Sequence, residues 1–265
     1  MILAFDVGNT ETVLGVLREG RVSGQWRLAT RPERTADELA LVVKALLADA
    51  SIRPGSLSGA VVGSVVPPLT PAIVTVCEQH LATRALLVDA ATPLPIRLEV
   101  DEPMTVGADR IANTLAAVRL YGRDTIVVDL GTATTFDCIR ADGAFVGGVI
   151  SPGVRTGADM LVSRTAKLPR VDLEPPATVI GRRTESSLMS GIFHGAVAAI
   201  DGIVDRIRAE WGREDVLVVA TGGLAPMLAP HCRTVERVEP HLTLYGLELA
   251  WRHVHGPTAG DVRLV

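Results

Sequence analysis

Excess charge of one sign, paired cysteines and clustered aromatic side chains are all missing from this sequence. Its 26 basic and 30 acidic residues leave a net charge of −4, so nothing in the electrostatics favours binding to nucleic acid or anionic lipid. The three cysteines are scattered and have neither metal-ligand nor redox spacing, and the three tryptophans are too dispersed to form a binding platform. We therefore expect a reduced, cytoplasmic protein with no nucleic-acid or membrane partner.

Long apolar runs are missing as well. The most apolar stretches, such as residues 60–66, are short and are closed by prolines, and none approaches the roughly 20 residues of a membrane span. The first residues are apolar but lack the basic segment of a signal peptide, so we expect no leader. With 265 residues, of which 48% are hydrophobic and 21% charged, the chain is ordinary for a soluble globular protein of one large or two small domains.

The sequence does contain an internal repeat. Residues 4–12 read AFDVGNTET and residues 127–135 read VVDLGTATT, and a constant shift of 123 aligns them without a gap. The same shift carries Gly20 onto Gly143 and Gly24 onto Gly147. Each half therefore predicts a strand, a turn of the size that holds a phosphate, a second strand, a glycine turn and a third strand.

A second match begins at Gly63 and at Gly222, a shift of 159. Because this shift exceeds the first by 36 (159 − 123), we expect an insertion in the second half, within residues 150–190. The alternative is that glycine turns after strands look alike by chance. This explanation is stronger for the second match than for the first.

Helices fill the spaces between the predicted strands. Residues 35–38, TADE, form a capping box ahead of a helix with apolar side chains at helical spacing. Further helices are expected from about Asp109 and after Thr184. Strands followed by helices, twice over, predict two α/β domains with a cleft between them, residues 1–118 and 119–265.

The turn after Asp6 has the composition of a phosphate site. Gly8 leaves the backbone accessible, and the hydroxyls and amides of Asn9, Thr10 and Thr12 can point at phosphate oxygens. The Asp6 carboxylate repels phosphate but suits Mg²⁺. The turn after Asp129 offers the same chemistry, so a two-sided grip on a polyphosphate is expected, although either turn alone is as well explained as a structural glycine turn.

Two other stretches are candidates for binding. In GADR, residues 107–110, Asp109 is either a helix N-cap or a base for a substrate hydroxyl, and its place at a helix start predicts a low pKa. The paired glycines Gly222 and Gly223 follow a buried strand and let a ring or ribose pack on the backbone; a plain strand-to-helix turn is the alternative.

The motifs DVGNT, GADR, DLGTATTFD, GGVISPG and TGG, in this order, resemble those of type III pantothenate kinases. This family lies in the actin, sugar-kinase and Hsp70 ATPase superfamily, and the resemblance runs from Ile2 to about Leu249. It implies duplicated ribonuclease H-like (actin-like ATPase) domains with a nucleotide cleft. The implied activity is the ATP-dependent phosphorylation of pantothenate to 4′-phosphopantothenate, the first step of coenzyme A synthesis. The resemblance also implies a homodimer, a divalent metal such as Mg²⁺, and a monovalent cation, K⁺ or NH₄⁺.

The resemblance also implies roles for individual residues. Those that contact ATP are Asp6, Val7, Gly8, Asn9, Thr10, Glu11, Thr12, Val13, Thr132, Gly222 and Gly223. Those that bind pantothenate are Gly107, Ala108, Asp109, Arg110 and Thr184, with Asp109 as the proton acceptor. Asp129 holds the monovalent cation, and Asp6 the divalent metal.

Two residues depart from the family pattern. Glu11 stands where members often carry Asn or His, and it either weakens ATP binding or attracts extra metal. Val100 stands near the place of an aromatic residue that packs on pantothenate in some members. The alternatives to this reading are a kinase for another small alcohol, a phosphatase of the same fold, and a regulator of transcription that is related to the family.

Overall fold

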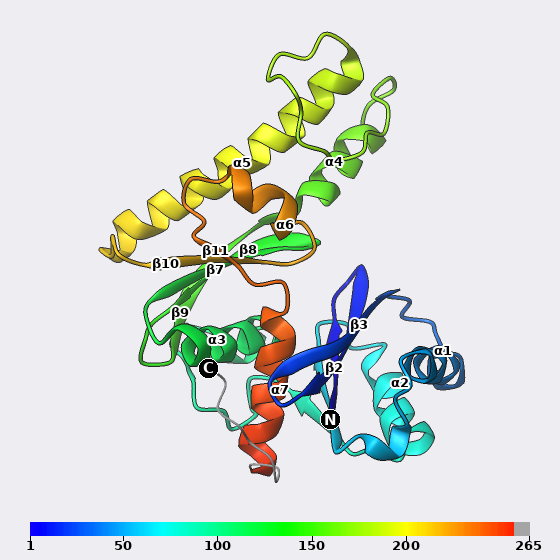
Figure 1. Cartoon of the computed structure of the whole chain (residues 1–265). Helices are drawn as coiled ribbons and strands as arrows, with labels where there is room; N and C mark the ends of the chain where they lie inside the picture. Colours follow the sequence, from blue (N-terminus) through cyan, green and yellow to red (C-terminus); the bar gives the residue numbers. More distant parts are fainter. Residues whose placement is uncertain (257–265) are drawn as a thin grey trace. The chain divides into compact units, whose positions relative to one another are not determined.

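The computed structural model describes residues 1–256 and divides them into two compact units. The first unit combines residues 1–120 with the described residues from 241 onwards, and the second holds residues 121–240 (Figure 1). Each is an α/β unit with its own sheet.

The first unit is built on a five-stranded sheet in the order β3-β2-β1-β4-β5. β1 pairs antiparallel with β2 and parallel with β4, so one side of the sheet is a meander and the other is parallel. Its elements are β1 (Ile2–Val7), β2 (Glu11–Arg18), β3 (Arg21–Ala29), α1 (Ala36–Asp49), η1 (Pro54–Ser56), β4 (Gly59–Ser64), α2 (Thr70–Thr75), the π-helical turn η2 (Val76–His80), β5 (Ala85–Val88), β6 (Arg97–Leu98), η3 (Pro103–Thr105), α3 (Ala108–Tyr121) and α7 (Leu242–His255).

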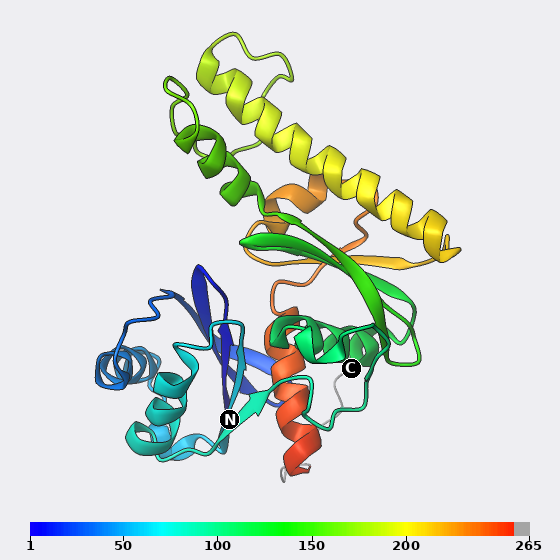
Figure 2. The same ribbon diagram turned by 180° about the vertical axis from the view of Figure 1, so that it is seen from behind.

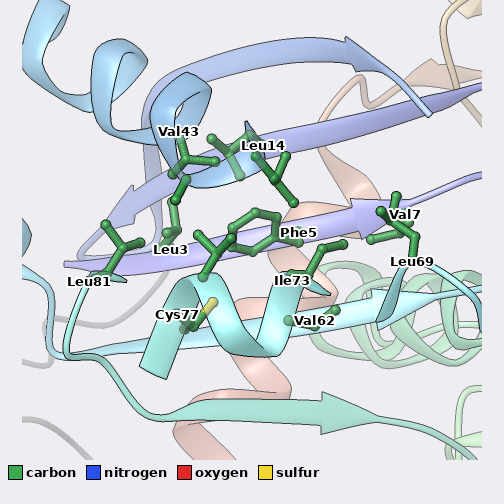
Figure 3. Close-up of a cluster of buried hydrophobic side chains, with 14 of the residues drawn as sticks. Leu3, Phe5, Val7, Leu14, Val43, Val62, Leu69, Ile73, Cys77 and Leu81 are labelled. Carbon is green, nitrogen blue, oxygen red and sulfur yellow. The ribbon is translucent and has the colours of Figure 1, made fainter. Parts of the chain in front are cut away.

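Alternate side chains of β1 enter two different cores. Leu3, Phe5 and Val7 pack with side chains of α1 and α2 in the cluster of Figure 3. Ile2 and Ala4 pack with α3 and α7 on the other side, and Figures 1 and 2 show the two helix pairs on opposite faces of this sheet. Because successive side chains of a strand alternate between faces, Asp6 belongs to the face that α3 and α7 cover.

Helix α7 is the last described element, yet it belongs to the first unit. Its Thr243 hydroxyl bonds Oδ1 of Asn113 in α3 over 2.9 Å, and the N–H of Gly20 bonds Oε1 of the buried Glu248 over 3.3 Å. Trp251 is buried in the core that α3 and α7 share. The sequence predicts a single division at 118/119; the structure instead returns residues 241–256 to the first unit, because α7 completes the apolar cover of the first sheet.

The second unit repeats this architecture. Its own strands take five consecutive places, in the order β9-β8-β7-β10-β11, of a six-stranded sheet, and α5 and α6 supply the helical side of its core. Its elements are β7 (Thr125–Leu130), β8 (Ala133–Ile139), β9 (Ala144–Pro152), α4 (Val154–Ser163), α5 (Thr184–Trp211), β10 (Leu217–Thr221), α6 (Ala225–Leu228), η4 (Ala229–His231) and β11 (Arg237–Val238).

The predicted repeat is confirmed most closely in the first and third strands of each half. Adding 123 to the bounds of β1 gives those of β7, and the same shift carries β3 onto β9. The strand orders of the two units correspond, and the matching glycines Gly20 and Gly143 both take positive φ, +78° and +89°. The five strands of each unit are therefore two copies of one arrangement.

The expected insertion is also present. Between β9 and β10 the second unit holds α4, the segment 164–183 and α5, whereas β3 and β4 of the first unit are joined through α1 and η1. Figures 1 and 2 show α4 and the start of α5 extending beyond their sheet. No residue of α4 is buried, and this segment exposes Met160, Leu161, Val179 and Ile180.

Helix α5 is long and apolar enough to span a membrane, although the apolar runs of the sequence predict no span. This similarity to a membrane span rests only on the length and composition of the helix, and core helices of soluble proteins have the same properties. Phe193, Ile200 and Val204 of α5 are buried in the core of the second unit, so part of its apolar surface is used for packing.

Candidate functional site

The turn after β1 is a tight hairpin. β1 and β2 pair with Asp6 opposite Val13 and Val7 opposite Thr12, and the N–H of Gly8 donates to the carbonyl of Glu11 over 3.0 Å. Asn9 and Thr10 at its tip are exposed. We call residues 8–11 the first turn. It presents polar backbone and side-chain groups to solvent, as a phosphate site requires.

A residue that the motifs do not include holds this turn. Thr30, which follows β3, donates its hydroxyl to the carbonyl of Gly8 (2.7 Å) and its N–H to the carbonyl of Thr10 (2.9 Å). Its hydroxyl also lies 2.9 Å from that of the buried Thr12. The Thr12 side chain thus contributes to the hydrogen bonding inside the hairpin, whereas Asn9 and Thr10 are exposed at its tip.

The GADR motif begins α3. The N–H of Ile111 donates to the carbonyl of Gly107 (3.1 Å), so Gly107 caps the helix and Asp109 lies inside its first turn. The Asp109 carboxylate accepts a bond from the N–H of Arg110 (2.8 Å). The N-cap alternative for Asp109 therefore does not match its place in the helix.

The low pKa that the sequence predicts for Asp109 is wrong. Loss of water contact raises the pKa of this carboxyl above its ordinary value, and the N–H and positive charge of Arg110 offset that shift only in part. A helix start favours a carboxylate through its free amides, but in this place desolvation is the larger effect. A carboxylate with a raised pKa is the stronger proton acceptor.

The first unit brings the first turn and GADR to the same edge of its sheet. Asp6 in β1 pairs with Gly63 in β4. A Cβ built on Gly63 would lie 3.5 Å from the Cβ of Ala108, and one on Gly107 would lie 3.2 Å from Cγ1 of Val65. Since Asp6 also belongs to the α3 face, the Asp6 carboxylate, the first turn and the candidate base Asp109 gather at the carboxyl ends of β1 and β4.

The segment ahead of GADR borders a cavity of about 260 Å³. Its apolar lining includes Leu94, Ile96, Leu98 and Met104, together with Ile111 of α3. None of the predicted site residues lines it. Val100, the departure from the family pattern, is half-buried and follows β6 in the chain, three residues before η3.

The second unit places Asp129 beside the paired glycines. Asp129 pairs with Thr135 of β8 and with Thr221 of β10, the residue before Gly222. Gly222 has φ +88°, and a Cβ there would lie 2.5 Å from Oδ1 of Asp129. Only glycine permits this contact, so the backbone after β10 lies directly against the carboxylate.

The second turn, residues 131–133, is fixed by the start of the insertion. The carbonyl of Thr132 accepts bonds from the N–H of Gly153 (3.1 Å) and from the hydroxyl of Thr156 in α4 (2.7 Å). Thr184 is the first residue of α5, and Figures 1 and 2 show that end of α5 beyond the sheet, near α4.

The residues present fit the ions that the fold implies. Among residues 1–256, no three His, Cys, Asp or Glu side chains gather where they would hold a metal. Mg²⁺ in nucleotide sites needs no such cluster, because one or two carboxylates, water and the phosphates of the substrate suffice, and Asp6 supplies a carboxylate. In the second unit, Asp129 supplies the carboxylate that could hold a cation, and its Oδ1 lies against the backbone of Gly222.

Comparison with known proteins gives the family. The family model for type III pantothenate kinases matches residues 2–206. The type III pantothenate kinase of Bacillus cytotoxicus is 39% identical over 251 residues, covering 95% of both chains. That of Roseiflexus sp. (strain RS-1) is 43% identical over 251 residues, covering 95% of this chain and 98% of the relative.

A solved structure agrees on the fold. A Campylobacter jejuni protein, described as a transcriptional activator of the Baf family, superposes with a TM-score of 0.60 over 95% of this chain and 98% of its own. It is 18% identical in sequence, so this likeness shows the fold alone. The duplicated strand order of the two units agrees with this shared fold, and the family match leads to one conclusion. The chain belongs to the type III pantothenate kinase family.

Proposed function

We propose that this chain transfers the γ-phosphoryl group of ATP to the primary hydroxyl of pantothenate and forms 4′-phosphopantothenate, the first step of coenzyme A synthesis. The observation that carries the proposal is the meeting of Asp6, the first turn and Asp109 at one edge of the first sheet. Together with membership of the family, this arrangement supports phosphate binding and proton acceptance by groups of one unit.

ATP binding uses backbone and hydroxyl donors in place of basic side chains. The residues proposed to contact ATP in the first unit are Asp6, Val7, Gly8, Asn9, Thr10, Glu11, Thr12 and Val13. Thr132, Gly222 and Gly223 of the second unit are proposed to contact it as well. Amides and hydroxyls at a turn can surround phosphate oxygens without the flexibility of lysine or arginine.

Asp109 is the proposed proton acceptor for pantothenate, which Gly107, Ala108, Arg110 and Thr184 help to bind. Its raised pKa supports this role, because a carboxylate that is poorly hydrated accepts a proton more readily. In phosphoryl transfer the bond to the nucleophile forms late, so the hydroxyl proton can leave late as well, and most of the catalysis is positioning and charge neutralisation.

Two ions belong to the proposal. Asp6 would hold a divalent metal such as Mg²⁺, which neutralises charge on the phosphates when bound. Asp129 would hold a monovalent cation, K⁺ or NH₄⁺, against the backbone of Gly222. Both carboxylates lie at the next-to-last residue of their strands, β1 and β7, at equivalent positions of the repeat.

A cytoplasmic homodimer is the proposed working form. The insertion supports it, since Met160, Leu161, Val179 and Ile180 are all exposed there, Ile180 at 83%. No residue of α4 is buried within the chain. Exposed apolar side chains of this kind are typical of a contact with another protein surface.

The proposal is tested by following ADP release from ATP with pantothenate, in the presence and absence of K⁺, and with a panel of other small alcohols. We expect turnover that needs pantothenate and is stimulated by K⁺ or NH₄⁺. Faster turnover of another alcohol would replace pantothenate as the substrate, and ADP release independent of any alcohol would indicate a phosphatase-like activity. A role in transcription has no support here, because the similarity to the Baf protein extends to the fold alone.

A further inference from the structure

One residue, Thr30, forms hydrogen bonds with two carbonyl groups of the first turn, those of Gly8 and Thr10. The hydroxyl of Thr30 donates to the carbonyl of Gly8 over 2.7 Å, and its N–H donates to the carbonyl of Thr10 over 2.9 Å. Since the single hydroxyl proton of Thr30 is used for Gly8, the bond of 2.9 Å between Thr30 and Thr12 takes its proton from Thr12.

These bonds fix the direction of the neighbouring N–H groups. In a trans peptide the C=O of one residue and the N–H of the next point in opposite directions, and no peptide bond among the described residues is cis. With the carbonyls of Gly8 and Thr10 turned to Thr30, the N–H groups of Asn9 and Glu11 point away from β3. They are donors of the kind that phosphate oxygens accept.

The second turn is held in the same way by different residues. The hydroxyl of Thr156 donates to the carbonyl of Thr132 over 2.7 Å, and the N–H of Gly153 donates to that carbonyl over 3.1 Å. The N–H of Ala133 therefore points away from α4. Gly153 stands 123 positions after Thr30, so it is the repeat's equivalent of Thr30 but has no hydroxyl. Thr156, three residues later, supplies one instead.

We propose that Thr30 and Thr156 are positioning residues for ATP, each of which aims the donors of one phosphate turn by holding a turn carbonyl away from the ligand. They act through the turns and need not touch ATP. The inference rests on the proposed function in that the ligand of both turns is the polyphosphate of ATP. Neither threonine belongs to the motifs on which that function is based.

The test removes each hydroxyl while keeping the shape of the side chain. Thr30→Val and Thr156→Val are each expected to raise KM for ATP and the Kd of MgATP, measured by calorimetry, about fivefold to tenfold, the size expected of a misdirected hydrogen-bond donor. KM for pantothenate should change less than twofold. Thr30→Ser and Thr156→Ser keep the hydroxyl and should stay within about twofold of the wild type in both measurements.

Matched controls separate this effect from loss of any threonine hydroxyl. Thr75, the last residue of α2, and Thr165, two residues after α4, donate to the carbonyls of Pro71 and Leu161 over 3.0 Å at exposed positions. Thr75→Val and Thr165→Val remove equivalent bonds far along the chain from both turns and should leave the Kd of MgATP unchanged. If Thr30→Val does not fold, the pair Thr30→Ala and Thr30→Ser makes the same comparison.

An unchanged Kd of MgATP in folded Thr30→Val and Thr156→Val would overturn the inference, as would an equal loss in the serine variants. A parallel rise of KM for both substrates would also contradict it, because a general loosening of the fold has that effect. Failure of the proposed function is distinguishable. In that case the wild type binds MgATP but does not turn over pantothenate, and the Kd comparison still tests the two threonines.

Discussion

Nη1 of Arg27 in β3 donates a hydrogen bond to Oε2 of Glu11 in β2 over 2.8 Å. Glu11 is the carboxylate whose presence at the first turn departs from the family pattern. Its partner is supplied from the neighbouring strand, where Arg27 pairs with Val13, two residues beyond Glu11. The negative charge at the first turn is therefore paired with a positive charge from β3.

We expect Arg27→Ala to raise KM for ATP about threefold to tenfold, because the unpaired Glu11 carboxylate then repels the polyphosphate. Both side chains are partly exposed, 43% and 51%, so salt should reduce the effect. Steady-state kinetics at low and high salt measure it. The double variant Arg27→Ala with Glu11→Gln should recover most of the loss, and Arg21→Ala, at the other end of β3, is the control. An unchanged KM in Arg27→Ala would mean that Glu11 does not affect ATP.

Asp109→Asn should lower kcat about 10²-fold to 10⁴-fold, since it removes the proton acceptor but keeps the shape of the side chain. The control is Asp159→Asn, in the second GAD triplet of the sequence, which lies on α4 and should keep wild-type activity. The pKa of Asp109 is raised by burial, so its ionised form reduces stability at neutral pH. We therefore expect Asp109→Asn to melt at the wild-type temperature or above; full activity in this variant would exclude Asp109 as the acceptor.

The pH profile should show the raised pKa of Asp109 directly. The carboxylate accepts a proton only when ionised, so kcat/KM for pantothenate should fall on the acid side at a pH above that of an ordinary aspartate, about 3.9. The charge of Arg110 lowers the pKa of Asp109 in opposition to burial, so Arg110→Gln should move the acid limb to still higher pH. An acid limb that moves to lower pH in this variant would contradict the assignment of the limb to Asp109.

Gly222→Ala should destabilise the second unit by about 1–3 kcal/mol and reduce stimulation by K⁺. The new Cβ would approach Oδ1 of Asp129 to 2.5 Å at a φ of +88°, so both backbone strain and the clash contribute. Gly122→Ala is the matched control, with φ +58° and nothing within 4 Å. It should lose about 1 kcal/mol by strain alone and keep its response to K⁺. Urea unfolding and activity against K⁺ concentration measure the two effects.

Ile180→Asp should shift the protein from dimer to monomer, because a charge on the apolar insertion cannot be desolvated at a subunit contact. Sedimentation velocity across protein concentration is the measurement. Leu41→Asp, a change of equal chemistry at a side chain that is 72% exposed on α1, should leave the oligomer intact. A wild-type monomer, or an unaltered dimer in Ile180→Asp, would remove the insertion from the proposed contact.

Some elements of the fold and of the site could be predicted because the sequence patterns that specify them are local. The capping box at Thr35 is present as predicted, with the Glu38 side chain returning to the Thr35 N–H. The starts of α3 and α5 also follow from short patterns. Thr30 carries no such signal, since its partners Gly8 and Thr12 lie 22 and 18 residues away. A lone threonine after a strand has the same sequence context whether or not it bonds a turn.

The sequence by itself determined the repeat, the strand-turn-strand order of each half and the family, because strand alternation, glycine turns and motifs are written in short stretches of chain. Only the tertiary structure decided that α7 joins the first unit, that burial outweighs the helix start at Asp109, and that threonines outside the motifs hold both turns. Each of these depends on contacts between distant segments. Desolvation and hydrogen-bond geometry are set by what the folded chain brings together, and no short stretch of sequence contains that information.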